Sequence, residues 1–252
     1  MRRAIGLLLA LLAFGPPAWA AVEVRVGCYE FSPYVEIDAD GRVRGLTPEL
    51  LDLLNESQGD YRFVPFLTTP SRRYQDFEAG LYDVIFFESP DWGWRSRNLP
   101  IDVSPVFLED AEVYIAHTEP GRTQAYFDDF AGKTIAGLLG YHYAFADFDS
   151  DPERLRSRFA MHLVTSNQAS IELVLRHRVD LAVVTLSYLK GYLADHPDAR
   201  SDLLVSDRRD QIYRHRIIVR KGFKPDAEAL FALLEGLQRN GALEALWRRH
   251  HL

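Results

Sequence analysis

The chain has 252 residues, of which 47% are hydrophobic, 12% aromatic and 26% charged. This balance excludes a disordered chain, a collagen-like chain and a disulfide scaffold, and it is typical of a globular protein. The formal net charge is −7, and no basic face stands out, so the composition argues against a nucleic-acid partner. Cys28 is the single cysteine, which excludes an intramolecular disulfide.

The first twenty residues have the pattern of a secretory signal peptide. Arg2 and Arg3 precede a short apolar run over 5–14, and Ala18 and Ala20 suit the small-residue positions of a cleavage site. The alternative is a membrane anchor, but the run is only about half of the ~20 residues that cross a bilayer. We expect cleavage after Ala20 and a periplasmic location. That leaves 252 − 20 = 232 residues to fold, enough for two lobes.

The first half of the mature chain alternates between predicted strands and helices. The strands are predicted at 22–26, 61–66 and 84–87, with one helix starting at Thr47 and another over 72–79. Thr47 offers a hydroxyl for the N-cap, and Pro48 suits the first helical position. Continuous apolar strands between helices indicate a parallel sheet covered on both faces.

The same alternation begins again after residue 130. Strands are predicted at 134–137, 161–164, 181–184 and 217–219, with a helix capped by Asn167, a helix over 227–237 and a short apolar segment at 243–247. In each half a helix ends and the chain enters a buried strand through an aspartate, Asp83 or Asp180. This repetition predicts two α/β lobes.

Six short motifs follow one another along the mature chain. They are VRVG with FSPY (24–34), GLTPEL (45–50), GLYDVI (80–85), FAGKTI (130–135), RVDLAVV (178–184) and RNGAL (239–243). In this order, behind such a leader, the chain resembles the family 3 solute-binding proteins of bacterial ABC importers. This is the polar amino-acid-binding group with the type II periplasmic fold. The resemblance implies an α/β protein of two lobes with mostly parallel sheets flanked by helices.

In that family the chain crosses twice between the lobes. The resemblance therefore implies a first lobe of residues 21–111 and 214–252, and a second lobe of residues 112–213. Such an architecture gathers strand ends and helix N-termini around one cleft, where backbone N–H groups favour an anionic group. A solute that contacts both lobes binds the closed form preferentially and shifts the hinge equilibrium. We expect a monomer that binds a small molecule and whose closed form an inner-membrane ABC permease recognises.

Two arginines compete for one expected role. In family members that bind amino acids, an arginine after the third strand holds the α-carboxylate in a bidentate pair. Counting forward from that strand favours Arg95, whereas counting back from Asp102 favours Arg97. The neighbouring Trp92 and Trp94 either stack on a solute or pack the edge of the lobe.

Further candidates in the first lobe follow from the same resemblance. Phe31 matches the position of the family's aromatic wall, and Tyr34 lies nearby; core packing is the alternative for both. Glu88 and Ser89 stand where the family has a small pocket segment. Glu88 either points into the cleft, where it would suit a cationic solute, or pairs with a loop arginine.

The second lobe departs from the family pattern at two places. Gly140 is followed by Tyr141 and His142 where the family usually has a hydroxyl residue, which predicts a more aromatic pocket. The family aspartate that holds an α-amino group falls at Thr185, which can hydrogen-bond an ammonium but cannot neutralise it. Another small polar or aromatic metabolite therefore stays open beside an amino acid.

No metal, nucleotide or other cofactor is expected. The GKT at 132–134 lacks the earlier glycine that a phosphate loop requires. His250 and His251 are adjacent on a terminal segment, and such neighbours rarely converge on one ion.

The leading interpretation is a binding protein without enzyme activity. A periplasmic cyclohexadienyl dehydratase is the enzyme alternative, because that enzyme resembles the same family. It needs a carboxylic acid as proton donor in the closed cleft, and Glu88 is the candidate. A third interpretation is a sensory module that presents its closed form to a receptor.

Overall fold

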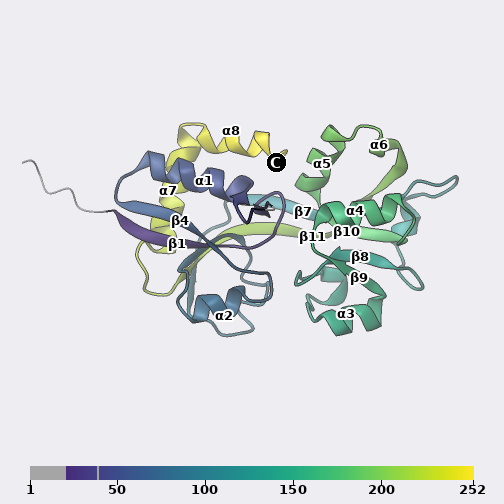
Figure 1. The fold of residues 1–252 in the computed structure, drawn as a ribbon, viewed down its shortest axis with the longest axis horizontal. Helices are drawn as coiled ribbons and strands as arrows, with labels where there is room; N and C mark the ends of the chain where they lie inside the picture. The colour runs from purple at the N-terminus through teal and green to yellow at the C-terminus, as the bar shows by residue number, and fades with distance from the viewer. Residues whose placement is uncertain (1–20, 39) are drawn as a thin grey trace, which may run out of the picture.

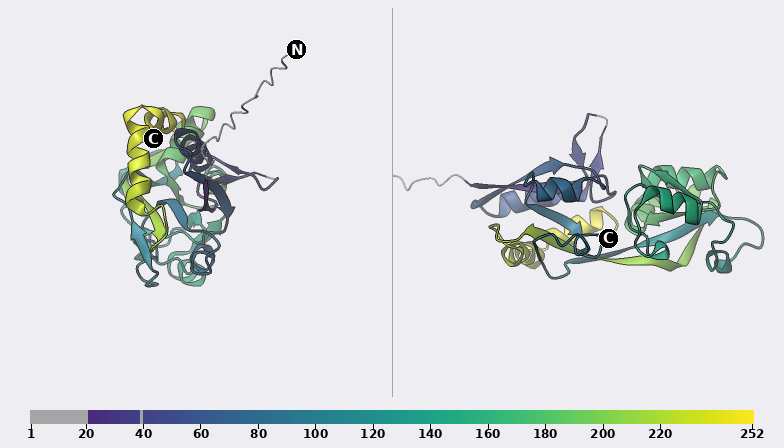
Figure 2. Two further views of the ribbon diagram at one scale, coloured as in Figure 1. Left: turned by 90° about the vertical axis from the view of Figure 1, so that its left-hand side faces the viewer. Right: turned by 90° about the horizontal axis from the view of Figure 1, so that it is seen from below.

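The computed structural model describes residues 21–38 and 40–252. The predicted signal peptide, residues 1–20, lies outside this part of the chain. Two bodies lie side by side and are joined by long strands (Figures 1 and 2). One is built from both ends of the described chain and the other from its middle. Within the described residues, no helix combines the length and the apolar character that crossing a membrane requires.

One sheet runs through both bodies in the order β4-β1-β5-β11-β7-β10-β8-β9, with β6 paired to β11. Its strands are β1 (Val22–Cys28), β4 (Tyr61–Leu67), β5 (Val84–Glu88), β6 (Ile101–Val103), β7 (Leu108–His117), β8 (Ile135–Leu138), β9 (Met161–Val164), β10 (Leu181–Thr185) and β11 (Leu203–Arg220). The pairs β1–β4, β1–β5, β8–β9 and β8–β10 are parallel, whereas β7 and β11 are antiparallel to their neighbours. A separate hairpin pairs β2 (Glu36–Ile37) with β3 (Val43–Arg44).

Helices lie on both sides of the sheet in each body (Figure 1). The first body carries α1 (Leu46–Ser57), α2 (Arg73–Glu78), α7 (Ala227–Arg239) and α8 (Ala242–Arg249). The second carries α3 (Pro152–Phe159), α4 (Asn167–Leu175), α5 (Leu186–Asp195) and α6 (Ala199–Asp202), with short 3₁₀ turns at Gln124–Phe127 and Ala144–Ala146. The predicted two-lobed α/β fold is confirmed, but the pairing is mixed: four strand pairs are parallel and five are antiparallel.

The strands β7 and β11 join the two lobes. They pair with each other from Leu203 opposite His117 to His215 opposite Leu108. Beyond this stretch β11 pairs with β5 in the first lobe, and the other end of β7 pairs with β10 in the second. The expected lobe boundaries, at 111/112 and 213/214, fall within this pair of strands, and the position of the hinge there stays a prediction.

Burial explains which strands the sequence could predict. Every residue of β5 and β10 is buried, as their continuous apolar sequences indicate. The sequence predicts the long strand β11 only at 217–219, because the preceding stretch contains a run of polar and charged residues over 206–211 and is only partly buried. Two predicted caps were wrong by one or two residues. Gly45, not Thr47, is the N-cap of α1, and Ser166, not Asn167, caps α4 by accepting from the Ala169 N–H at 3.2 Å.

Gly45 connects the start of α1 to the loop that carries Tyr34. Its φ of +94° is open to glycine and strained for other residues, and a Cβ there would meet the Pro33 carbonyl oxygen at 2.6 Å. The first amides of α1 bind this loop, with Leu46 donating to Pro33 and Thr47 donating to Tyr34.

Replacing Gly45 by alanine should therefore destabilise the protein. We expect Gly45→Ala to lower the free energy of unfolding by about 1–3 kcal/mol, measured by urea unfolding. Gly59→Ala is the matched control, since no atom lies within 4 Å of a Cβ at that position, and its effect should stay within about 0.5 kcal/mol. Equal stability of the two variants would refute the strain at Gly45.

Candidate functional site

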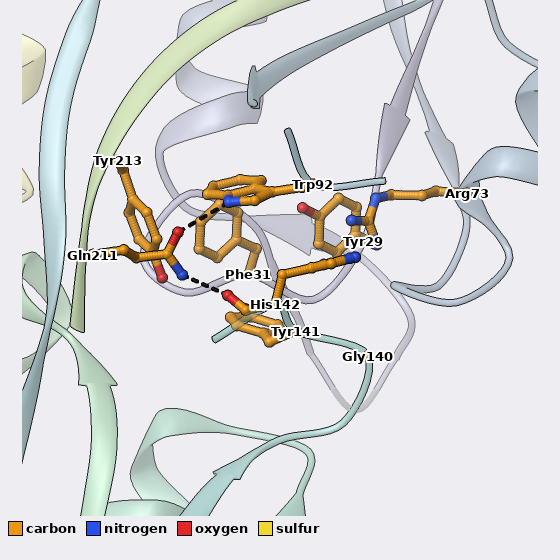
Figure 3. A pocket seen from close by; sticks show the side chains of 9 residues that line it. All are labelled: Tyr29, Phe31, Arg73, Trp92, Gly140, Tyr141, His142, Gln211 and Tyr213. Atoms are coloured by element: carbon orange, nitrogen blue, oxygen red, sulfur yellow. Dashed lines mark hydrogen bonds between the residues drawn. The ribbon is translucent and has the colours of Figure 1, made fainter. Parts of the chain in front are cut away.

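A small cavity lies where the two lobes meet at the β7–β11 pair (Figure 3). It is lined by Tyr29, Phe31, Arg73, Trp92, Gly140, Tyr141, His142, Gln211 and Tyr213. Its volume is about 20 Å³, which is room for about one water molecule. The site is therefore closed around its own side chains.

The topology explains why these residues meet. Tyr29 directly follows β1, Trp92 follows β5, and Gly140 follows β8. The carboxyl ends of parallel strands share one edge of a sheet, and loops from both lobes therefore converge at this edge. Gln211 and Tyr213 come from β11, so the site also includes the connection between the lobes.

Phe31 is the centre of the aromatic lining. Its ring centroid lies 5.9 Å from Tyr29, 5.8 Å from Trp92, 5.5 Å from Tyr141 and 5.7 Å from Tyr213. The last three pairs are edge-to-face, the arrangement that suits the aromatic quadrupole. Tyr141 comes from the second lobe, so these contacts join the lobes through apolar surface.

Hydrogen bonds cross the same interface. Trp92 Nε1 of the first lobe donates to Gln211 Oε1 at 3.1 Å. Within residues 112–213, Gln211 Nε2 donates to Glu112 Oε2 at 2.7 Å and to the His142 carbonyl at 2.5 Å. Tyr141 donates its hydroxyl proton to the Glu30 carbonyl at 3.2 Å. The Trp92 and Tyr141 bonds thus connect the two lobes through buried polar groups.

Two buried carboxyl groups lie on β7 beside the cavity. Burial raises the pKa of Glu112 to about 8, the negative charge of Asp210 adds to this shift, and contacts with Tyr213 and Gln211 oppose it. Burial also raises the pKa of Asp110, which accepts from the Ser187 hydroxyl at 2.6 Å and the Tyr34 hydroxyl at 2.7 Å. The Asp110 contacts join a first-lobe tyrosine to a second-lobe serine.

Arg73 is the charged residue of the lining. Its Nε lies 3.1 Å from Glu88 Oε1, and both side chains are at most 2% exposed. The guanidinium also packs over the rings of Tyr29 and Tyr74, at 4.7 and 4.4 Å. Burial raises the pKa of Glu88, and Arg73 opposes that shift. The pair holds the arginine in one orientation against the cavity.

His142 is neutral in this setting. Burial lowers the pKa of its ring to about 3, and the positive charges of Arg73 and Arg97 act in the same direction. The ring therefore offers one donor and one acceptor nitrogen, and it adds no charge to the cavity.

The structure gathers five of the twelve residues expected at the site. Phe31, Trp92, Gly140, Tyr141 and His142 line the cavity. Their part in ligand binding stays a prediction.

The other candidates in the first lobe lie outside the lining. Glu88 is buried beneath it and accepts from Trp94 Nε1 at 2.9 Å, which places Trp94 in the core. Ser89 is half-buried, and its hydroxyl accepts from the Asp91 N–H at 3.3 Å. Tyr34 is buried and donates to Asp110. These side chains contact other groups of the protein and do not face the cavity.

Thr185 is buried in the second lobe at the end of β10. The Thr185 N–H donates to Asn167 Oδ1 at 3.2 Å, and the Asn167 amide donates to the Ser32 carbonyl of the first lobe at 3.4 Å. Thr185 therefore lies next to the interface without lining the cavity.

Neither competing arginine lines the cavity. Arg95 is exposed and forms an ion pair with Asp91. Arg97 packs over the Tyr74 ring at 4.0 Å and faces a separate polar groove of about 560 Å³, which also includes His142 and residues 147–151.

Four lining residues were not found by sequence reasoning. They are Tyr29, Arg73, Gln211 and Tyr213. Tyr29 had a usable signal, because it directly follows a predicted strand. Arg73 is a buried residue of α2 that belongs to no motif. Gln211 and Tyr213 lie in a stretch for which the sequence predicts no element. No three histidine, cysteine or acidic side chains of residues 21–38 and 40–252 converge as a metal site would require.

Comparison with known proteins confirms the fold. No protein-family model matches the chain, and no curated protein matches its sequence. A histidine-bound substrate-binding protein of an ABC uptake transporter from Streptococcus pneumoniae has a similar structure, with 17% identity, a TM-score of 0.69, and coverage of 90% of this chain and 91% of the other. A mutant of ArgBP from T. maritima aligns with 18% identity, a TM-score of 0.67, and coverage of 90% and 94%.

An ancestral amino-acid-binding protein, a precursor of cyclohexadienyl dehydratase, is a third similar structure. It has 15% identity, a TM-score of 0.66, and coverage of 91% of this chain and 96% of the other. The chain therefore has the two-lobed type II periplasmic binding fold. At these sequence identities, the similarity is evidence for the fold alone.

The buried Glu112 predicts a pH dependence of stability. Below pH 4.5, the ordinary value for this group, the carboxyl is protonated in both folded and unfolded chains. Between pH 4.5 and about 8 the unfolded chain releases the proton and the folded chain retains it, so the free energy of unfolding falls as pH rises. Above pH 8 this effect is complete.

Glu112→Gln should remove this component. Relative to the variant, the unfolding equilibrium constant of the wild type should rise about tenfold per pH unit between pH 5 and 8. Urea unfolding at each pH measures the difference. The two proteins share every other ionisable group, so the difference between them reports Glu112 together with its interaction with Asp210. Parallel stability curves would show that Glu112 is ionised in the folded protein.

Proposed function

We propose that the protein is a periplasmic solute-binding protein that captures a small amino-acid-like molecule between its lobes for an ABC importer. The observation that carries the proposal is the cavity at the lobe interface, which is lined by loops of both lobes and by the strand that joins them. A solute bound there contacts both lobes, so it stabilises the closed form. The leader at residues 1–20 supports export to the periplasm.

The lining favours a zwitterionic or polar solute with a flat or apolar part. Five aromatic side chains, those of Tyr29, Phe31, Trp92, Tyr141 and Tyr213, offer ring surfaces. Arg73 with Glu88 provides one buried charge pair without a large net charge. Similar structures with bound histidine, lysine or arginine support an amino acid as the first class to test.

A thermal-shift screen of the mature protein against amino acids and related metabolites tests the proposal. A solute at ~100 times its dissociation constant adds about 2.7 kcal/mol, and ~1 kcal/mol raises the midpoint by about 2–4 °C in a chain of this size. A true ligand should therefore raise the midpoint by about 5–11 °C. A screen without any shift would contradict the proposal.

We further propose that the protein is a monomer and that its closed form docks on a permease.

Arg73, rather than Arg95 or Arg97, is the proposed anchor for an anionic group of the solute. Its Nε faces Glu88 and its Nη1 donates to the Pro70 carbonyl, while Nη2 has no hydrogen bond within the described chain. These two contacts orient the guanidinium plane, and a planar guanidinium so held can meet a carboxylate in a way that lysine cannot.

Arg73→Lys should weaken binding of the screened ligand by about tenfold to a hundredfold, measured by isothermal titration calorimetry. Arg95→Lys is the matched control and should bind like the wild type, because Arg95 is exposed and paired with Asp91. The thermal midpoint of each variant checks folding. If Arg97→Lys or Arg95→Lys loses affinity and Arg73→Lys retains it, the anchor lies in the loop.

The dehydratase alternative has no proton donor at the expected place. Glu88 pairs with Arg73 below the lining instead of facing the cavity. Incubation with prephenate or arogenate, followed by detection of an aromatic product, separates the two functions. Product above background would replace the binding-only proposal. The sensory alternative is tested by asking whether the ligand-bound protein retains a receptor in a pull-down from membranes.

A further inference from the structure

Gln211 holds a special position in the closed protein. It lies on β11, within the pair of strands that joins the lobes, and its side chain reaches into the site between Trp92 and His142 (Figure 3). Trp92 belongs to the first lobe and His142 to the second. The side chain is therefore a bridge between lobes, in the place where a bound solute would act as one.

The carboxamide of Gln211 is fully engaged. Its oxygen accepts from Trp92 Nε1 at 3.1 Å, and its nitrogen donates to Glu112 at 2.7 Å and to the His142 carbonyl at 2.5 Å. An amide has two N–H donors, and both are used here. Gln211 thus has no donor left for a solute, and the remaining cavity of about 20 Å³ does not admit one.

The partners of Gln211 define a subsite with one donor and two acceptors. The indole N–H of Trp92 requires an acceptor, whereas the Glu112 carboxyl and the His142 carbonyl accept N–H groups. A carboxylate has no N–H for the His142 carbonyl, and an ammonium or guanidinium group has no acceptor for the indole. A primary carboxamide satisfies all three partners.

We propose that Gln211 is an internal ligand, whose side chain fills a primary-carboxamide subsite and holds the lobes closed when no solute is bound. The proposal rests on the proposed function in that the subsite belongs to the solute cleft. A solute with a primary carboxamide can take over these hydrogen bonds and displace the side chain. A solute without one leaves the three partners unpaired in a buried site.

Chemical complementation tests the proposal on the ligand-free mature chain. Gln211→Ala removes the atoms that acetamide can replace. Small-angle X-ray scattering of the wild type should match the closed structure, and Gln211→Ala should give a larger radius of gyration. Acetamide should return Gln211→Ala to the wild-type value and leave the wild type unchanged. Acetate, which has the same shape without the N–H donors, should not restore closure.

Two further variants guard against an effect of misfolding. Gln238→Ala, at an exposed site on α7, is the matched control and should remain as compact as the wild type. Trp92→Phe retains a ring and removes the indole donor, and it should also increase the radius of gyration. An open wild type, a compact Gln211→Ala, or equal rescue by acetate and acetamide would each overturn the proposal. These outcomes involve no transported solute, so a failed ligand screen refutes the proposed function separately.

Discussion

The antiparallel pairing of β7 with β11 is the constraint on which the rest of the structure depends. The chain passes between the lobes through these two strands. They pair with each other, and in addition β11 pairs with β5 in the first lobe and β7 pairs with β10 in the second. The same two strands carry Asp110, Glu112, Gln211 and Tyr213. Because the site is built partly on these connecting strands, a bend in them would move the polar groups that join the lobes.

Under the proposed function, closure of this interface would exchange hydrogen bonds to water for hydrogen bonds within the protein. Asp110 accepts a hydrogen bond from one hydroxyl of each lobe. Asn167 of the second lobe donates to the Ser32 carbonyl of the first. Opening would hydrate these groups, and a hydrogen bond to water nearly balances one within the protein. The aromatic contacts of Phe31 with Tyr141 add apolar burial. A near balance of this kind allows a few hydrogen bonds to decide between open and closed forms.

The sequence predicted the fold better than the site. Strands such as 161–164, with apolar side chains and clear boundaries, were predicted as observed. The stretch 203–216 was missed because its charged residues face solvent on a strand that crosses between lobes, where burial is partial. Arg73 and Gln211 reach the cavity only through tertiary structure. Conversely, the loop position of Arg95 matched a family role, but its side chain turns to Asp91 in solvent.

The proposed function, together with the proposed closure on the protein's own side chains, imposes a thermodynamic condition. The lining residues leave a cavity of about 20 Å³, so a solute that enters it must displace groups that already satisfy the buried polar atoms. If only the open molecules can take up the solute, the apparent affinity equals the intrinsic affinity multiplied by the fraction of molecules that are open. Selectivity then depends on replacing every lost hydrogen bond, because an incomplete match leaves a buried donor or acceptor unpaired. Such a cleft rejects a solute that lacks one of the required donors or acceptors, even when its other contacts are favourable.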